Sequence, residues 1–123
     1  MKIDRENLKN EFKTRIYHWT LRLIKVMDEL PRSASSQIMA AQLLRSGTSV
    51  GANYVEAQAS PSRKDFANFL HHALKSANES KFWLALLRDS GKMQKENADD
   101  LLNELSQLAN VLGASLLTIK GRR

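Results

Sequence analysis

The amino-acid sequence predicts an all-α protein folded as an antiparallel up-down-up-down four-helix bundle. Apolar residues repeat at spacings of three and four along four long segments, which is the period of one helical face. The breaks between these segments are short and rich in Pro, Ser and Gly, and no segment carries a strand signal of comparable strength. Short connections make consecutive helices neighbours. We therefore expect one domain over residues 1–123, with helices at about 4–30, 35–59, 62–90 and 95–120.

The first two segments meet at Pro31. The first has one apolar face, made of Leu8, Phe12, Ile16, Trp19, Leu23, Met27 and Leu30. Either Ser33 or Ser35 can cap the second helix, because a serine oxygen accepts a hydrogen bond from a first-turn amide. The residues that we expect to face the core from the second helix are Ile38, Ala41, Leu44, Val50 and Val55.

The third and fourth segments have the clearest periodicity. Ser62 and Asp65 have the spacing of a capping box, with Asp in place of the usual Glu. The third helix should end at Ser90-Gly91, a typical C-cap pair. Its apolar face, interrupted by Ser80, is Phe66, Leu70, Ala73, Ala77, Leu84 and Leu87, and that of the fourth helix includes Ala98, Leu101, Leu105, Leu108 and Leu112.

Two glycines, Gly47 and Gly51, lie one turn apart inside the second predicted helix, among Ser, Thr and Ala. Glycine in a helix interior costs about 1 kcal/mol relative to alanine, so two in one turn indicate a close approach to bare backbone. The approaching group is either another helix or a ligand such as a phosphate. Close helix–helix packing is the more ordinary of these explanations.

Composition limits the classes of protein that remain. There is no cysteine, which excludes disulfides and thiolate metal sites and favours a reducing compartment. No apolar run approaches the roughly 18–20 residues that span a bilayer, and the charged N-terminus lacks the apolar core of a signal peptide. We expect a cytoplasmic protein with no membrane contact. Its 19 Lys and Arg against 13 Asp and Glu, a net charge of +6, are compatible with a polyanionic partner.

The apolar residues exceed what one bundle needs. On the third segment, Phe69, Phe82 and Trp83 extend the apolar stripe over nearly two faces. A second apolar face on a helix usually packs against another subunit. The sequence therefore predicts self-association, although the pattern does not fix the number of subunits.

The middle of the chain resembles the 23S rRNA intervening-sequence protein family. The resemblance rests on Leu43-Leu44-Arg45-Ser46, Gly51-Ala52-Asn53-Tyr54 with Glu56-Ala57, Ser62-Arg63-Lys64-Asp65-Phe66 with Phe69-Leu70 and Ala73-Leu74-Lys75, and Glu79-Ser80-Lys81-Phe82-Trp83-Leu84. It covers most of the second and third predicted helices, whereas the first and fourth are similar to the family in pattern and length only.

The resemblance implies a left-handed bundle that assembles as a ring of five. A related branch, the accessory proteins of diversity-generating retroelements, works beside a reverse transcriptase and binds nucleic acid, while the molecular activity of the family at large is not established. The partners implied are the chain itself as a homopentamer, RNA or DNA, and a reverse transcriptase or other neighbour-encoded protein.

Catalytic chemistry is not indicated. His71 and His72 are adjacent, so their rings point about 100° apart on a helix and cannot share a metal. His18 has no carboxylate at helical spacing to complete a ligand set. No Gly-x-Ser-x-Gly elbow or phosphate-binding glycine loop is present. We expect no catalytic residues, no bound metal and no cofactor.

Two sets of residues are candidates for contacts. We expect Gly47, Gly51, Asn53, Tyr54, Glu56, Glu79 and Trp83 to lie at helix or subunit interfaces, with Arg45 or Lys81 as an ion partner of the carboxylates. The candidates for contacting nucleic acid are Arg63, Lys64, Lys9, Lys13, Arg122 and Arg123. The first two stand beside a helix N-terminus, where amide groups suit a phosphate oxygen.

These patterns favour a non-enzymatic oligomer that binds the backbone of RNA or DNA, or that assists a nucleic-acid enzyme such as a reverse transcriptase. An ordinary solvated surface would account for the same basic residues. The alternative function is a scaffold or adaptor that contacts only protein.

Overall fold

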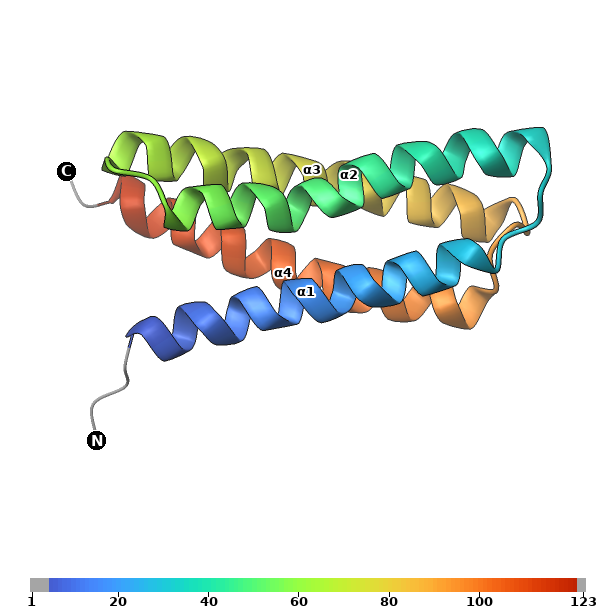
Figure 1. The fold of residues 1–123 in the computed structure, drawn as a ribbon, viewed down its shortest axis with the longest axis horizontal. Coiled ribbons are helices and arrows are strands. Elements are labelled where there is room, and N and C mark those ends of the chain that lie inside the picture. The colour runs from blue at the N-terminus through green and yellow to red at the C-terminus, as the bar shows by residue number, and fades with distance from the viewer. Residues whose placement is uncertain (1–4, 122–123) are drawn as a thin grey trace.

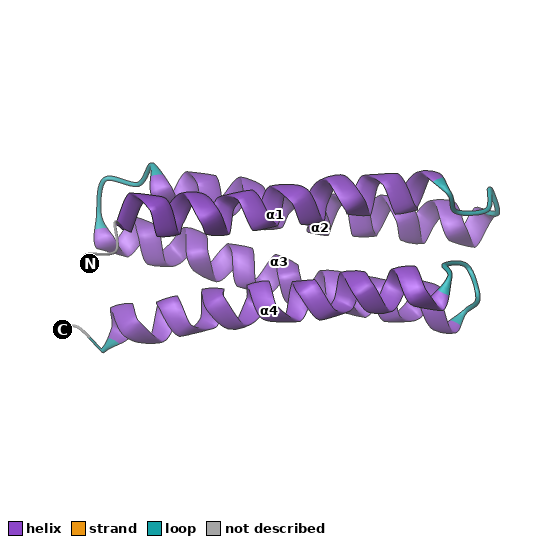
Figure 2. Ribbon diagram, turned by 90° about the horizontal axis from the view of Figure 1, so that it is seen from below, coloured by secondary structure: helices purple, strands orange, loops and turns teal. Residues whose placement is uncertain are grey.

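The computed structural model describes residues 5–121, with side chains from residue 9 onwards. This part of the chain is all-α and has four helices, α1 (Arg5–Asp28), α2 (Ala34–Gln58), α3 (Arg63–Asp89) and α4 (Lys95–Lys120). All four lie along one long axis, and α1 and α3 begin at the end of the molecule where α2 and α4 finish (Figure 1). Each helix packs against two others, α1 and α3 both lying between α2 and α4. Figure 2 shows the same bundle from below.

Local signals in the sequence explain where the helices begin and end. Ser33 caps α2, its Oγ accepting a hydrogen bond from the amide of Ser36 at 3.2 Å. At the end of α3, Gly91 has a positive φ of 78°, which glycine adopts without steric cost. The amide of Lys92 then reaches the carbonyl of Leu87 at 2.9 Å, closing a Schellman motif.

The expected core faces are correct for α3, α4 and the part of α1 whose side chains are described, and wrong for much of α2. Leu8 lies outside the residues whose side chains the structure describes. Ile38 is 66% exposed, and Ala41 and Val55 are also exposed. The buried side of α2 instead carries Ser36, Leu43, Ser46, Gly47, Val50, Tyr54 and Ala57. Small side chains let the neighbouring helices approach closely, so this stripe is buried although it is less apolar than the other one. Of the expected stripe, only Val50 is fully buried and Leu44 partly so, whereas Ile38, Ala41 and Val55 are left on the surface.

The glycines bring α2 close to α1. A Cβ atom on Gly47 would lie 2.4 Å from Cδ2 of Leu23, and one on Gly51 would lie 3.1 Å from Cγ2 of Ile16. The first distance is shorter than side-chain contacts allow. Close packing of α2 against α1 therefore explains why glycine stands at position 47 despite its low helix propensity. The same explanation holds for Gly51, where the approach is less tight.

The contact between α2 and α3 is polar at its centre. Ser46 and Ser80 are buried and share a hydrogen bond of 2.8 Å, and one turn away Ser76 donates to Ser49 at 2.9 Å. Asn53 continues this line by donating to the carbonyl of Ser49 at 2.9 Å. Since buried hydroxyl groups are costly without partners, these pairs fix the register of the two helices.

Candidate nucleic-acid interface

One end of the bundle carries the beginnings of α1 and α3 and the ends of α2 and α4 (Figure 1). We call it the terminal end and define it by residues 9–13, 55–66 and 116–120. A hollow of about 400 Å³ opens there, and all four helices or their connections contribute to its wall. The residues that line it are Lys9, Ala57, Gln58, Ser60, Pro61, Ser62, Arg63, Phe66 and Ile119.

The loop from α2 to α3 is held in place by its serines. Ser60 Oγ donates to the carbonyl of Glu56 at 2.9 Å, which fastens the loop to the last turn of α2. Ser62 has extended backbone angles and accepts the amide of Asp65 at 3.1 Å, so α3 begins at Arg63. The first turn of α3 consequently faces the hollow, with Arg63 in its wall.

The structure brings together two of the predicted cations and separates a third. Lys9 from α1 and Arg63 from α3 line the same hollow, and Lys64 is exposed in the same turn as Arg63. Lys13 lies one turn along α1 but lines a different hollow, between α1 and α2. Arg122 and Arg123 lie outside the described residues.

Sequence reasoning missed the polar side chains of Gln58 and Ser60, which also line the hollow. The available signal was the Ser-Pro-Ser turn, since a loop that reverses the chain places its polar residues beside the next helix N-terminus. Lys9 could not be paired with Arg63 from the sequence, because the two are far apart along the chain.

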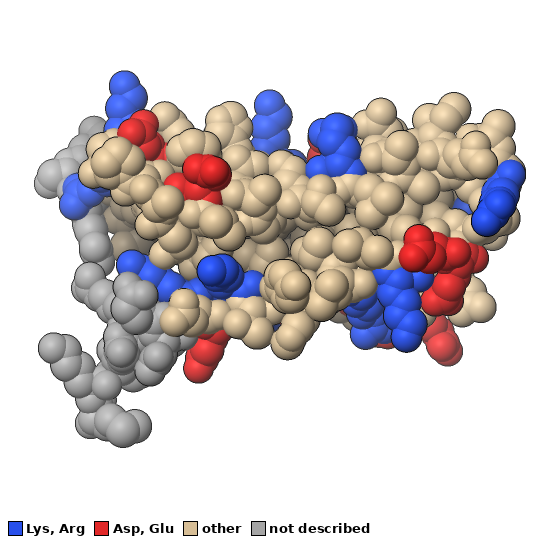
Figure 3. All heavy atoms as spheres, viewed as in Figure 1, with Lys and Arg blue, Asp and Glu red and all other residues tan. Residues whose placement is uncertain are grey.

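Charge differs between the two ends of the bundle. The described residues of the terminal end hold more cations than carboxylates: Lys9, Lys13, Arg63, Lys64 and Lys120 against Glu11, Glu56 and Asp65. At the opposite end (residues 22–32 and 88–100) the two signs are equal in number, with Arg22, Lys25, Arg32, Arg88, Lys92 and Lys95 against Asp28, Glu29, Asp89, Glu96, Asp99 and Asp100. Figure 3 shows red and blue atoms side by side at that end.

The residues expected at interfaces fall into three groups. Gly47 and Gly51 lie in the contact between α2 and α1, and Asn53 is half-buried on α2, where it donates to Ser49 of the same helix. Tyr54 is buried with its ring 5.0 Å from that of Phe12, edge to face, and burial raises the pKa of its hydroxyl. A partner subunit is not needed to explain these positions.

Glu79, Trp83 and Glu56 lie at the surface. The indole of Trp83 donates to Glu79 at 3.0 Å, and Arg45 of α2 forms an ion pair with the same carboxylate. The Trp83 hydrogen bond, and after it Arg45, hold the pKa of Glu79 below its usual value. Glu56 is exposed and belongs to the wall of the hollow between α1 and α2.

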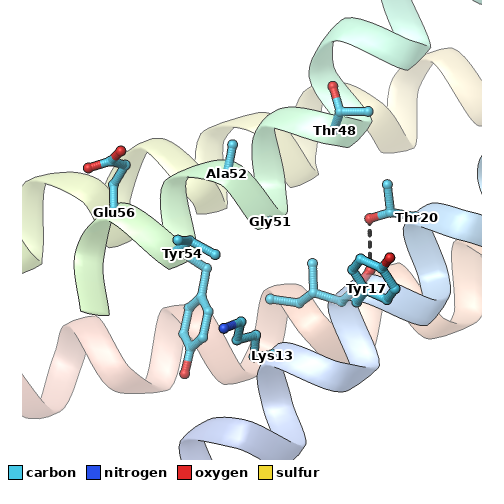
Figure 4. Close-up of a pocket in the computed structure, with 10 residues that line it drawn as sticks. Lys13, Tyr17, Thr20, Thr48, Gly51, Ala52, Tyr54 and Glu56 are labelled. Atoms are coloured by element: carbon cyan, nitrogen blue, oxygen red, sulfur yellow. Dashed lines mark hydrogen bonds between the residues drawn. The ribbon is translucent and has the colours of Figure 1, made fainter. Parts of the chain in front are cut away.

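That second hollow is the α1/α2 groove, of about 410 Å³ (Figure 4). Gly51 forms part of its wall, and Tyr17 and Val55 are exposed beside it. Thr20 donates its hydroxyl to the carbonyl of Ile16 at 2.8 Å, and Thr48 donates to that of Leu44 at 2.6 Å. With both hydroxyl hydrogens used inside their own helices, the groove is mainly apolar.

Residues 5–121 contain no cluster of three or more His, Asp or Glu side chains that could hold a metal ion. Within these residues no helix is both long and apolar enough to cross a bilayer.

The fold and the hollow define the class as a small all-α four-helix bundle protein with a cation-lined recess at one end. Residues 9–114 match the model of the 23S rRNA-intervening sequence protein family, and the chain belongs to this family.

A solved structure agrees with this assignment. The chain is similar to a protein of unknown function from the S23 ribosomal protein family of Bacteroides thetaiotaomicron, with 33% sequence identity and a TM-score of 0.81. The match covers 88% of this chain and 96% of the other. A comparison with curated proteins gave no match.

Proposed function

We propose that this protein is a non-enzymatic bundle that binds the sugar-phosphate backbone of RNA or DNA through its terminal end. The observation that carries the proposal is the shared hollow, in which Lys9 of α1 and Arg63 of α3 stand beside Ser62 and the first turn of α3. Lys64 is exposed in the same turn as Arg63, and Lys13, Arg122 and Arg123 are further candidates for contacting the backbone.

The chemistry of the hollow suits phosphate. Cationic side chains form charge-assisted hydrogen bonds with phosphate oxygens, and the first amides of a helix have no acceptor within the helix. The helix dipole adds a partial positive charge at the same point. Such contacts position a nucleic-acid backbone without reading its bases, so we expect little sequence preference.

The family assignment supports a nucleic-acid role. Its name refers to an intervening sequence of 23S rRNA, which connects these proteins with RNA through their name and no further. The protein would act in the cytoplasm, either on nucleic acid alone or beside a reverse transcriptase or other neighbour-encoded enzyme.

The functional unit that we propose is a ring of five up-down-up-down bundles. Exposed apolar residues on α1, α2 and α3 support self-association, because a single bundle leaves them in water. Five chains of net charge +6 would together carry +30. Repeated basic ends would also bind one polyanion with increased avidity.

The test has two parts. Light scattering at micromolar concentration should give a mass near five times the 13.9 kDa chain, and a monomer mass would contradict the ring. Titration of structured RNA and of duplex DNA at about 50 and 200 mM salt should show affinity falling by orders of magnitude, as counterion release requires.

A protein-only scaffold is the second candidate, and the exposed apolar surface is the observation that favours it. Phe82 is 60% exposed although it is a large aromatic residue. If neither nucleic acid binds at the lower salt concentration, the scaffold becomes the better account.

A further inference from the structure

The chain carries two apolar surfaces on different sides of the bundle. One is the α1/α2 groove described above. The other is a pair of α3 residues that we call the α3 ridge, Phe82 and Leu86, which lie one turn apart and are both exposed. The buried face of α3 carries Ala77, Ser80 and Leu84, so the ridge points away from the core.

The groove is concave at its middle because Gly51 has no side chain. The nearest atom to a Cβ built there would be Cγ2 of Ile16, at 3.1 Å, so the recess has an apolar floor. Toward the opposite end of the bundle the apolar surface continues over Leu21 and Ile24 of α1, which are also exposed. At the terminal end the groove finishes at two charges, Lys13 and Glu56.

The ridge has a matching shape. The ring of Phe82 stands 5.1 Å from that of Trp83 in an edge-to-face arrangement, so it is supported at its base. Trp83 is itself fixed by its hydrogen bond to Glu79. A supported aromatic side chain loses little freedom when it enters a pocket, which makes it a suitable anchor for an interface.

We infer that the α3 ridge of one copy docks into the α1/α2 groove of the next copy, so that the chains join head to tail. This inference rests on the self-association proposed above and names the surfaces that would meet. A head-to-tail contact uses two different surfaces of each chain, and it closes into a ring when the rotation between neighbours allows closure.

The spacing of charges fits this arrangement when all copies point the same way. With Phe82 over Gly51, Asn78 lies four residues from Phe82 toward the terminal end, and Val55 lies four residues from Gly51 in the same direction. In the same direction, Lys75 lies seven residues from Phe82, which is about 10.5 Å along α3 at 1.5 Å per residue. Glu56 lies five residues from Gly51, which is about 7.5 Å along α2. The side chain of Lys75 is long enough to span the difference between these two distances. Its ammonium group would therefore meet the exposed carboxylate of Glu56 on the neighbouring copy.

The partner that fits is therefore a second copy of this chain. In the other direction, Leu86 would lie against Leu21 and Thr48, which extend the apolar contact. Each copy in a closed ring would cover one groove and one ridge, leaving neither surface in water.

Charges introduced on either surface test the inference first. Phe82→Glu alters the ridge, and Tyr17→Glu with Val55→Glu alters the groove; all three positions are exposed, so the fold should survive. Both variants should fall from the wild-type mass to the monomer mass in light scattering. Leu117→Glu is the matched control, because Leu117 is 73% exposed and belongs to neither surface. It should keep the wild-type mass.

Cysteine pairs then test which surfaces meet. The chain has no cysteine, so Val55→Cys and Asn78→Cys can be crosslinked by a short bis-maleimide without background. Each variant alone should give no covalent dimer, the mixture should give dimers only, and the double variant should give a ladder of multiples.

Three results would overturn the inference. A covalent dimer from either single variant would show a two-fold contact in place of a head-to-tail one. A double variant that does not crosslink, in a wild type that assembles, would contradict the proposed surfaces while leaving self-association intact. A wild type that is monomeric would contradict both, and the salt titration would still test nucleic-acid binding separately.

Discussion

At the opposite end of the bundle, cations and carboxylates are paired with one another. Arg88 contacts Asp99 at 2.8 Å, Lys95 contacts the same carboxylate at 2.8 Å, and Arg22 contacts Asp100 at 2.7 Å. At the terminal end, where cations outnumber carboxylates, Lys9 and Arg63 line a hollow that also holds the N-terminal turn of α3. Arg22 and Arg88 therefore connect α1 and α3 to α4 at one end, whereas an arginine and a lysine border a recess at the other. Position within the fold, more than net charge, identifies the candidate binding site.

The first way to break this comparison is to reverse charge at the terminal end. The double variant Arg63→Glu/Lys64→Glu should weaken RNA binding by about a hundredfold or more at low salt, because every chain of the assembly loses two phosphate contacts. The fold should not suffer, since acidic residues in the first turn of α3 suit the helix dipole. Filter binding measures the affinity, and light scattering checks that assembly is unchanged.

A matched control carries the same change in charge at the opposite end. Arg32→Glu/Lys95→Glu serves this purpose because Lys95 begins α4 as Arg63 begins α3. Affinity should stay within a few-fold of wild type. If both double variants weakened binding equally, net charge alone would explain the effect and the terminal end would have no special role.

The second prediction concerns the body between the two ends. Gly47→Ala would place a Cβ 2.4 Å from a terminal methyl of the fully buried Leu23. Overfilling of a core costs about 1–3 kcal/mol, of which the better helix propensity of alanine returns at most about 1 kcal/mol. We expect a lower free energy of unfolding, measured by urea denaturation, with unchanged affinity of the folded protein for RNA.

Gly113→Ala is the matched control in α4. Nothing lies within 4 Å of a Cβ at this position, so only helix propensity acts and stability should rise by up to about 1 kcal/mol. Equal stability changes for the two glycines would contradict the close approach of α1 to α2.

Much of the fold is predictable from the sequence. The faces of α1, α3 and α4 follow from regular spacing of Leu, Ala and aromatic residues, and the capping serines follow from their positions before apolar runs. In α2 the periodicity of large apolar residues was misleading, because Gly47 and Ser46 are buried in place of Ile38 and Ala41. A helix face that allows close approach carries small side chains, and the spacing of large apolar residues does not reveal such a face.

The candidate site was only partly readable. Arg63 and Lys64 were recognisable from their place after Ser62, whereas the neighbourhood of Lys9 depends on how α1 packs against α2 and α4. Lys9 and Lys13 form one stripe in the sequence, yet they line different hollows because each faces a different groove of the bundle. Helical spacing places residues on a face but does not say which neighbour that face meets.

The smallest expected effect belongs to the opposite end. Hydrogen bonds from Lys95 and then Arg88 hold the pKa of Asp99 below its usual value. A depressed carboxylate pKa contributes stability above the unfolded pKa, and this contribution is lost as pH falls through the folded pKa. Asp99→Asn should therefore lower Tm slightly at neutral pH, with the difference from wild type shrinking as pH falls below about 4.

Calorimetry across this pH range measures the effect, and RNA affinity at neutral pH should not change. A Tm difference that persisted unchanged in acid would show that the ion pairs of Asp99 are not its cause.

Mapping where RNA touches the protein tests the central claim most directly. Photo-crosslinking of thiouridine-containing RNA to the wild-type protein at low salt, followed by mass spectrometry of the peptides, reports contact positions without any substitution. Crosslinks should concentrate in peptides that contain Lys9 and residues 58–66. Crosslinks concentrated in residues 88–100 would contradict the assignment of the terminal end as the nucleic-acid interface.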